Sequence, residues 1–165
     1  MPSSATQRIE ALSNHLAATA PAPTTQTMST EKKPPITCHV LDTTIGRPGA
    51  SIPVVLTLLN PTSPPAGART PIKFSGLTNS DGRVTSWKNA TVFSSETLEE
   101  IWQAEKGDKA YSLTFDTDAY FGQRGIKTFF PEVTVQFVIR DEQMSEHFHV
   151  PVLLGPFGYT TYRGS

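Results

Sequence analysis

Residues 133–140 read VTVQFVIR and residues 147–154 read HFHVPVLL, and these two stretches decide the fold class. Apolar side chains recur at every second position, and both stretches are rich in β-branched and aromatic residues, which is typical of strands. The stretch AYSLTFD at 110–116 has the same pattern. We therefore expect these three stretches to be the clearest strands of a β-rich domain.

Working outward, further short β-type runs are separated by turn residues, which is the pattern of an all-β sandwich. The tetrapeptide Asn79-Ser80-Asp81-Gly82 predicts a tight turn in which Gly82 takes a positive φ angle. The additional strands are expected at 36–42, 53–59, 71–78, 83–87 and 158–164, which makes eight in all. The sequence thus predicts an all-β, two-sheet, eight-stranded sandwich over residues 36–165.

Helix is scarce in this sequence. Residues 97–105 carry a Thr97-x-x-Glu100 capping box and predict one short helix. Residues 117–125 predict a second, with Thr117 as its N-cap and Gly125 as its C-terminal stop. Neither is long enough to form a helical layer on the sandwich.

Composition limits the partners and the compartment. With 165 residues the chain is long enough for one ordinary domain, and a net charge of -1 gives no electrostatic basis for binding nucleic acid or an anionic membrane. The longest apolar run, at 52–59, is far shorter than the roughly 20 residues of a membrane span. The single cysteine, Cys38, excludes an internal disulfide and fits a reducing compartment.

The first 35 residues are expected to form a flexible tail, because residues 17–35 contain four prolines and almost no large apolar side chains. Residues 8–16, RIEALSNHL, would form a short amphipathic helix. This nonapeptide resembles the N-terminal peroxisomal targeting signal and predicts import by its receptor. A chance match would leave the protein in the cytoplasm.

Three of the four histidines fall in the expected sandwich. His147 and His149 share one face of their strand, whereas Cys38 and His39 point in opposite directions, so that a site containing His39 places Cys38 in the core. A solvated strand face would explain His147 and His149 equally well. A zinc site made of the three histidines is a further alternative.

The C-terminus distinguishes these alternatives. The chain ends Tyr162-Arg163-Gly164-Ser165, and the expected last strand runs into this end, although most chain termini fray. The ending resembles that of the 5-hydroxyisourate hydrolases of the transthyretin-like family. Four further motifs are similar to motifs of this family and occur in the same order: HVLD at 39–42, TNSDGR at 78–83, FFPEV at 129–133 and HFHVPVLL at 147–154. The loops at 60–71 and 88–106 are longer than the family's compact loops.

The resemblance implies a homotetramer built as a dimer of dimers, and the hydrolytic opening of the lactam ring of 5-hydroxyisourate without a metal or organic cofactor. It assigns His39, Arg83 and His149 to catalysis and Tyr162 and Ser165 to the substrate pocket. Imidazole can act as acid or base near neutral pH, and an arginine can stabilise developing negative charge. His147 is a neighbour able to orient His149. A transthyretin-like carrier of a small ligand is the alternative function.

Overall fold

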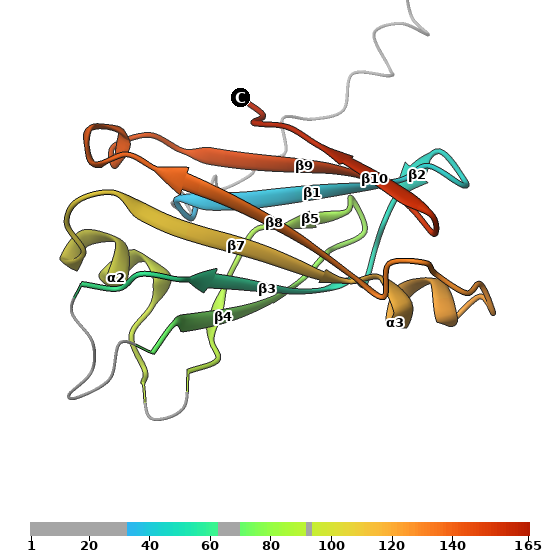
Figure 1. Ribbon diagram of the computed structural model, residues 1–165, viewed down its shortest axis with the longest axis horizontal. Helices are drawn as coiled ribbons and strands as arrows, with labels where there is room; N and C mark the ends of the chain where they lie inside the picture. Colours follow the sequence, from blue (N-terminus) through green and yellow to red (C-terminus); the bar gives the residue numbers. More distant parts are fainter. Residues whose placement is uncertain (1–32, 63–69, 92–93) are drawn as a thin grey trace, which may run out of the picture. The chain divides into compact units, whose positions relative to one another are not determined.

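In the computed structural model, which describes residues 33–62, 70–91 and 94–165, two five-stranded sheets pack face to face (Figure 1). Strand β1 (Ile36–Asp42) is central in the first sheet, where it pairs in parallel with β9 (Phe148–Gly155). The hairpin partner of β9 is β10 (Gly158–Thr161). On its other side β1 pairs antiparallel with β2 (Arg47–Pro48) and β5 (Arg83–Val84).

The second sheet is antiparallel throughout and has the order β6-β4-β3-β7-β8. Its strands are β3 (Pro53–Leu58), β4 (Ile72–Leu77), β6 (Lys88–Asn89), β7 (Lys109–Asp116) and β8 (Glu132–Ile139). The core between the sheets is built from alternate side chains of both, such as Val40, Leu56, Phe74 and Leu113, all of them fully buried. The predicted all-β sandwich is confirmed.

All eight expected strands are present, and the described residues contain two more, β2 and β6, of two residues each. Two expected strands are each three residues shorter than predicted. The strand expected at 83–87 ends at Val84, and the one expected at 158–164 ends at Thr161. The last strand does not run on unbroken, because pairing stops at Thr161 and resumes only at Gly164, which forms a single β-bridge with His149.

Both expected helices are present. Helix α2 (Leu98–Ala104) has the predicted capping box, in which the Thr97 hydroxyl accepts from the Glu100 amide and the Glu100 carboxylate accepts from the Thr97 amide. Helix α3 (Thr117–Gly122) differs from the prediction, because its N-cap is Asp116 and not Thr117.

The difference arises because the Asp116 side chain, and not the Thr117 side chain, bonds to the first turn of α3. The Asp116 carboxylate accepts from the Ala119 amide at 2.9 Å, and the Thr117 hydroxyl donates to the Phe130 carbonyl. The helix also ends at Gly122, three residues before Gly125, which adopts a positive φ of 69° in the turn that follows.

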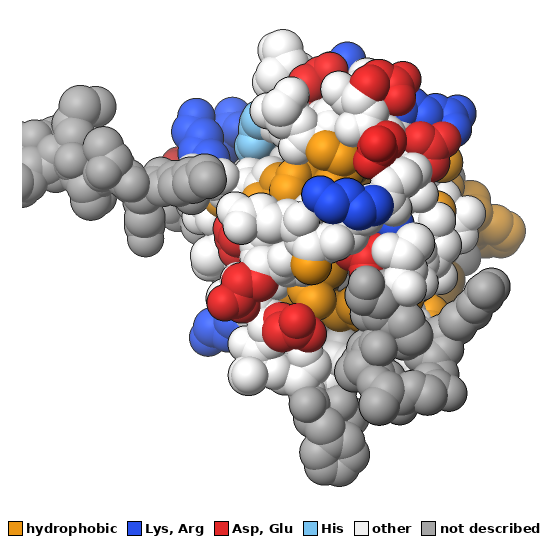
Figure 2. All heavy atoms as spheres, turned by 90° about the vertical axis from the view of Figure 1, so that its left-hand side faces the viewer, with side chains coloured by type: hydrophobic (Ala, Val, Ile, Leu, Met, Phe, Trp, Pro, Cys, Tyr) orange, Lys and Arg blue, Asp and Glu red, His pale blue; other side chains and the backbone are white. Residues whose placement is uncertain are grey.

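Three predicted features lie outside the described residues. These are residues 1–32 of the expected tail, the nonapeptide at 8–16 within it, and residues 63–69 of the loop at 60–71. Within the described ranges, no helix has the length and apolarity needed to cross a bilayer. Figure 2 shows the end of the sandwich that carries α2, where acidic and basic side chains are interspersed and do not gather into one charged field.

A buried carboxylate ties α3 to the end of β1. Asp42 is fully buried, and its oxygens accept from the Thr44 amide and hydroxyl, from the Tyr120 hydroxyl at 2.9 Å and from Arg124 Nη2 at 2.6 Å. Burial raises the pKa of Asp42, but these hydrogen bonds outweigh burial and hold the pKa below its ordinary value. The charged carboxylate therefore stabilises the fold above its unfolded pKa, and this contribution is lost as the pH falls through the folded pKa.

Replacing Asp42 with Asn should lower the free energy of unfolding by about 2–4 kcal/mol, because an amide cannot accept all four bonds and leaves Arg124 without its counter-charge. Urea denaturation of the full chain measures this loss. The matched control is Asp108→Asn, since Asp108 also accepts from an arginine (Arg140 Nη1, 2.7 Å) and a backbone amide, but at the surface. Equal losses in both variants would contradict the role given to Asp42.

Candidate active site

The outward face of the first sheet brings together residues from three strands. On β1, the side chains of Ile36, Cys38 and Val40 are buried in the core, and His39 points to the opposite face. The predicted division between Cys38 and His39 is therefore confirmed. Burial raises the pKa of the Cys38 thiol to about 12, so the thiol is neutral and lies away from the outward face.

Strand register places the three predicted catalytic residues side by side. His39 is paired with Arg83 of β5. Thr37, two residues before His39 and on the same face of β1, is paired with His149 of β9. The His39 and His149 rings have centroids 6.3 Å apart, and Arg83 Nη1 lies 3.5 Å from His149 Nε2. The guanidinium and the two imidazoles thus form one cluster, although they come from strands far apart in the sequence.

The predicted turn at 79–82 holds Arg83 in this cluster. The Asn79 side chain accepts from the amides of Asp81 and Arg83, at 3.0 and 2.9 Å. Gly82 has a φ of 74°, and a Cβ atom on it would lie 2.3 Å from the Val40 carbonyl oxygen. Only glycine permits this approach, and the Gly82 carbonyl then accepts from the Val40 amide at 2.8 Å. The turn is bonded directly to β1.

Thr37 is a member of the site that was not predicted from the sequence. Its hydroxyl lies 2.8 Å from His149 Nδ1 and 3.0 Å from His147 Nε2. His147 Nδ1 in turn lies 3.0 Å from the Pro34 carbonyl oxygen. The two-residue spacing between Thr37 and His39 was the available signal, since it places both side chains on one strand face.

Both histidines of the cluster are held in the neutral form. Burial lowers the pKa of His149, and Arg83, His39, His147 and Lys33 lower it further. Burial and Arg83 also lower the pKa of His39, against a smaller rise caused by the main chain and the charge of Asp81. The two rings therefore have free lone pairs at neutral pH and are suited to accept protons.

The C-terminal segment lies against His149. The Gly164 amide donates to the His149 carbonyl at 2.9 Å. A Cβ atom on Gly164 would lie 2.9 Å from both His149 Cδ2 and Pro151 Cγ, so a side chain here would push the segment off the sheet. The structure thus places the chain end at His149. Ser165 follows Gly164 and is exposed.

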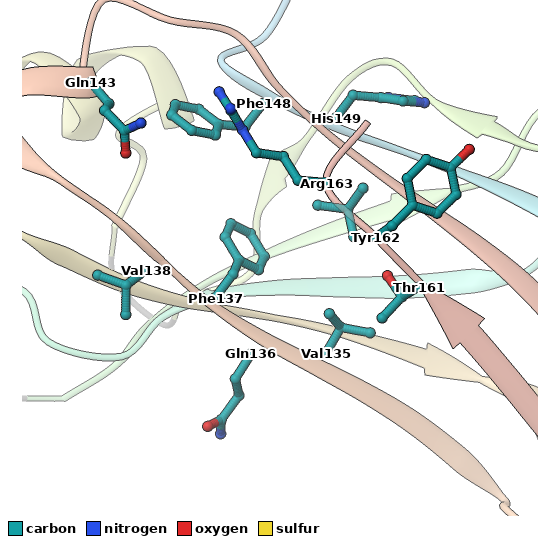
Figure 3. A pocket seen from close by; sticks show the side chains of 11 residues that line it. Val135, Gln136, Phe137, Val138, Gln143, Phe148, His149, Thr161, Tyr162 and Arg163 are labelled. Carbon is teal, nitrogen blue, oxygen red and sulfur yellow. The ribbon is translucent and has the colours of Figure 1, made fainter. Parts of the chain in front are cut away.

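A cavity of about 360 Å³ opens between β8 and the C-terminal segment (Figure 3). Phe137 and Phe148 line its apolar part, Arg163 lies beside Phe148, and Tyr162 and His149 lie at its other side. Arg163 extends over the Phe148 ring and pairs with Glu146, whereas Tyr162 points away from Phe148.

Neither His39 nor Arg83 lines this cavity. They lie on the open outward face of the sheet in the single chain, and His149 borders both this face and the cavity. Among residues 33–62, 70–91 and 94–165, no three His, Cys, Asp or Glu side chains have an arrangement that could hold a metal ion.

Comparison with known proteins agrees with this architecture. A family model described as the HIUase/Transthyretin family matches residues 36–164. The chain is 37% identical over 132 residues to a probable 5-hydroxyisourate hydrolase of Schizosaccharomyces pombe, which covers 80% of this chain and 92% of that protein. It is 38% identical over 139 residues to 5-hydroxyisourate hydrolase of Mus musculus, covering 84% of this chain and 100% of the mouse protein.

A solved structure of 5-hydroxyisourate hydrolase from Klebsiella pneumoniae has the same fold. It aligns with a TM-score of 0.53 and 28% sequence identity, over 79% of this chain and 97% of the bacterial chain. The family model and the two relatives each span most of the chain, and residues 36–164, which the family model matches, include the strands that carry the site. The chain belongs to the HIUase/Transthyretin family.

Proposed function

We propose that this chain is a hydrolase that opens the lactam ring of 5-hydroxyisourate. The observation that carries the proposal is the placement of Arg83 beside two imidazoles of lowered pKa on one sheet face. The substrate is inferred from the names of the two relatives, a probable 5-hydroxyisourate hydrolase and a 5-hydroxyisourate hydrolase.

The cluster contains the groups that this reaction needs. One imidazole takes a proton from water as the oxygen attacks the ring carbonyl carbon, and Arg83 stabilises the negative charge that develops on the carbonyl oxygen. When the carbon–nitrogen bond breaks, the protonated imidazole gives its proton to the leaving nitrogen. Tyr162 and Ser165 are proposed to bind the substrate beside this cluster. The bonds and protons balance without a metal or an organic cofactor.

The direct test mixes the purified full chain with freshly generated 5-hydroxyisourate and follows its ultraviolet decay against the spontaneous rate. Decay at the spontaneous rate would overturn the proposal. Carriage of a small ligand, the alternative function within this fold, predicts saturable binding without turnover. It does not account for two imidazoles and a guanidinium on one face.

Replacing His39 or His149 with Asn should lower kcat/KM by roughly 10²- to 10⁴-fold, the usual contribution of a positioned acid or base. Circular dichroism should show an unchanged fold, because both rings lie outside the core. The control is Cys38→Ala on the same strand, which should turn over at close to the unmodified rate. Loss of activity in a well-folded Cys38→Ala variant, with activity kept in His39→Asn, would reverse the assignment.

Replacing Arg83 with Gln should raise the pKa of both His39 and His149, because the guanidinium charge lowers both. Histidine ring signals followed by NMR across a pH titration measure this shift without the need for turnover. The protonated rings should then persist to higher pH than in the unmodified protein. The control is Arg140→Gln, which removes an arginine that pairs with Asp108 instead. Unmoved titration curves in Arg83→Gln would contradict the charge coupling within the cluster.

We also propose that a second copy covers the open site face in a homotetramer built as a dimer of dimers. The side chains of Leu153 and Tyr162 are exposed in the single chain, 38% and 59% respectively. Leu153 lies on the same face of β9 as His149, and Tyr162 lines the same cavity as His149. Sedimentation at micromolar concentration should show a tetramer, and Leu153→Glu should dissociate it and lower turnover. Leu77→Glu, at a more exposed site (59%) on β4 of the other sheet, is the control. A fully active monomer would exclude a shared site.

We propose further that the protein is addressed to peroxisomes by residues 8–16, because this nonapeptide resembles the N-terminal peroxisomal targeting signal. Residues 1–35 fused to a fluorescent protein should reach peroxisomes, and Arg8→Ala should return the fusion to the cytoplasm. A fusion that stays cytoplasmic without this substitution would end the proposal.

A further inference from the structure

The Thr37 hydroxyl is the middle of a chain of hydrogen bonds that begins at a backbone carbonyl and ends at the candidate site. The chain runs from Pro34 O to His147 Nδ1 at 3.0 Å, from His147 Nε2 to Thr37 Oγ1 at 3.0 Å, and from Thr37 Oγ1 to His149 Nδ1 at 2.8 Å. Thr37 is 8% exposed, so water competes little for its hydroxyl. The far nitrogen of His149, Nε2, faces Arg83.

The direction of this chain follows from its first member. A carbonyl oxygen only accepts, so His147 Nδ1 donates to Pro34, and in an imidazole with one ring hydrogen the other nitrogen is then an acceptor. Thr37 has a single hydroxyl hydrogen, which it therefore donates to His147 Nε2. Its oxygen is then the acceptor for His149, whose Nδ1 must carry the hydrogen.

Resting on the function proposed above, we infer that Thr37 is a positioning residue that fixes His149 as the Nδ1-protonated tautomer and so makes its Nε2 the general base. In this tautomer the Nε2 lone pair points to the side where Arg83 lies 3.5 Å away. When Nε2 takes the proton of water, the bond from Nδ1–H to the Thr37 oxygen strengthens, because the donor becomes charged. The chain orients the ring and conducts no proton, since it ends at a carbonyl.

His39 lies outside this chain. Its ring interacts with the Asp81 main chain on the turn before β5, and its centroid is 6.3 Å from that of His149. A change at Thr37 therefore leaves the hydrogen bond of His39 in place. His39 thus serves as an internal reference in any experiment that observes both rings.

The charged and titratable groups around His149 come from every element packed against it. They are Lys33 before β1, His39 on β1, Arg83 on β5, His147 before β9, and Tyr162 and Arg163 of the C-terminal segment. Lys33, His39, Arg83 and His147 oppose a positive charge on the His149 ring, and Arg163 is paired with Glu146. The Thr37 oxygen is the neutral group that favours the charged ring, so its removal should move the protonation of His149 to lower pH.

The test compares Thr37→Val, which removes the hydroxyl, with Thr37→Ser, which keeps it. In ¹⁵N NMR of the full chain, the unmodified protein and Thr37→Ser should show His149 protonated at Nδ1, and Thr37→Val should show loss of this preference. The signals of His39 should stay in place in all three proteins. A matched control is Thr114→Val on β7, whose hydroxyl bonds to Thr134 on the second sheet.

With 5-hydroxyisourate as substrate, Thr37→Val should lower kcat by roughly 10- to 100-fold, the effect typical of losing a partner that orients a functional histidine. KM should change by less than about threefold, and the acid limb of the pH profile should move to lower pH. Thr37→Ser should recover most of kcat. Thr114→Val should match the unmodified protein in all three measurements.

Two results would overturn the inference: His149 protonated at Nε2 in the unmodified protein, or a folded Thr37→Val variant with unchanged kcat and pH profile. The first result needs no variant, so the inference stays testable even if Thr37→Val fails to fold. Failure of the proposed function appears differently, as decay of 5-hydroxyisourate at the spontaneous rate while the NMR spectra show the expected tautomer.

Discussion

The parallel pairing of β1 with β9 is the contact on which the site depends. It runs in unbroken register over seven residues of β1, from Ile36 opposite Phe148 to Asp42 opposite Leu154. Paired residues on neighbouring strands share a face, so the same register that buries Cys38 beside Val150 sets Thr37 beside His149. A slip by one residue would exchange the two faces of the sheet. Burial of apolar side chains on the inner face therefore determines which polar groups meet on the outer face.

Two glycines bring the remaining parts of the site to these strands. Gly82 brings the turn that carries Arg83 against the Val40 carbonyl, and Gly164 brings the chain end against His149 and Pro151. In both places a Cβ atom would meet its neighbour at less than 3.0 Å. The Gly82 backbone thus packs on the backbone of β1, and the Gly164 backbone packs on the His149 and Pro151 rings. The hydrogen bonds between Val40 and Gly82 and between Gly164 and His149 then fix the positions of Arg83 and the C-terminal segment.

The polar groups of the site and of the core follow different electrostatic rules. Asp42 keeps its charge when buried because four hydrogen bonds compensate for the loss of water. Lys109 and Glu105 form a buried ion pair at 2.9 Å. At the site, burial and then the neighbouring Arg83 charge lower the pKa of His39 and His149, which favours their neutral forms. Hydrogen bonds and opposite charges thus stabilise charged side chains near α3 and α2. At the site, burial and a neighbouring cation disfavour charge on the two histidines.

Much of this could be predicted from the sequence because it depends on local patterns. Alternation along a strand separates Cys38 from His39, and the Thr97-x-x-Glu100 spacing specifies a helix start. The two-residue strands β2 and β6 were missed because such short segments are strands only by virtue of their partners. The wrong N-cap prediction at Thr117 has a similar cause. The Thr117 hydroxyl donates to the carbonyl of Phe130, thirteen residues away, and Asp116 caps α3.

The sequence by itself thus determined which residues of the strands face outward and which face the core, and it supplied the candidate residues of the site. Only the tertiary structure decided that Thr37 lies between His147 and His149, which follow it by 110 and 112 residues. Nothing local couples positions so far apart. Their proximity follows from the pairing of β1 with β9, and that pairing is set by how the whole core packs.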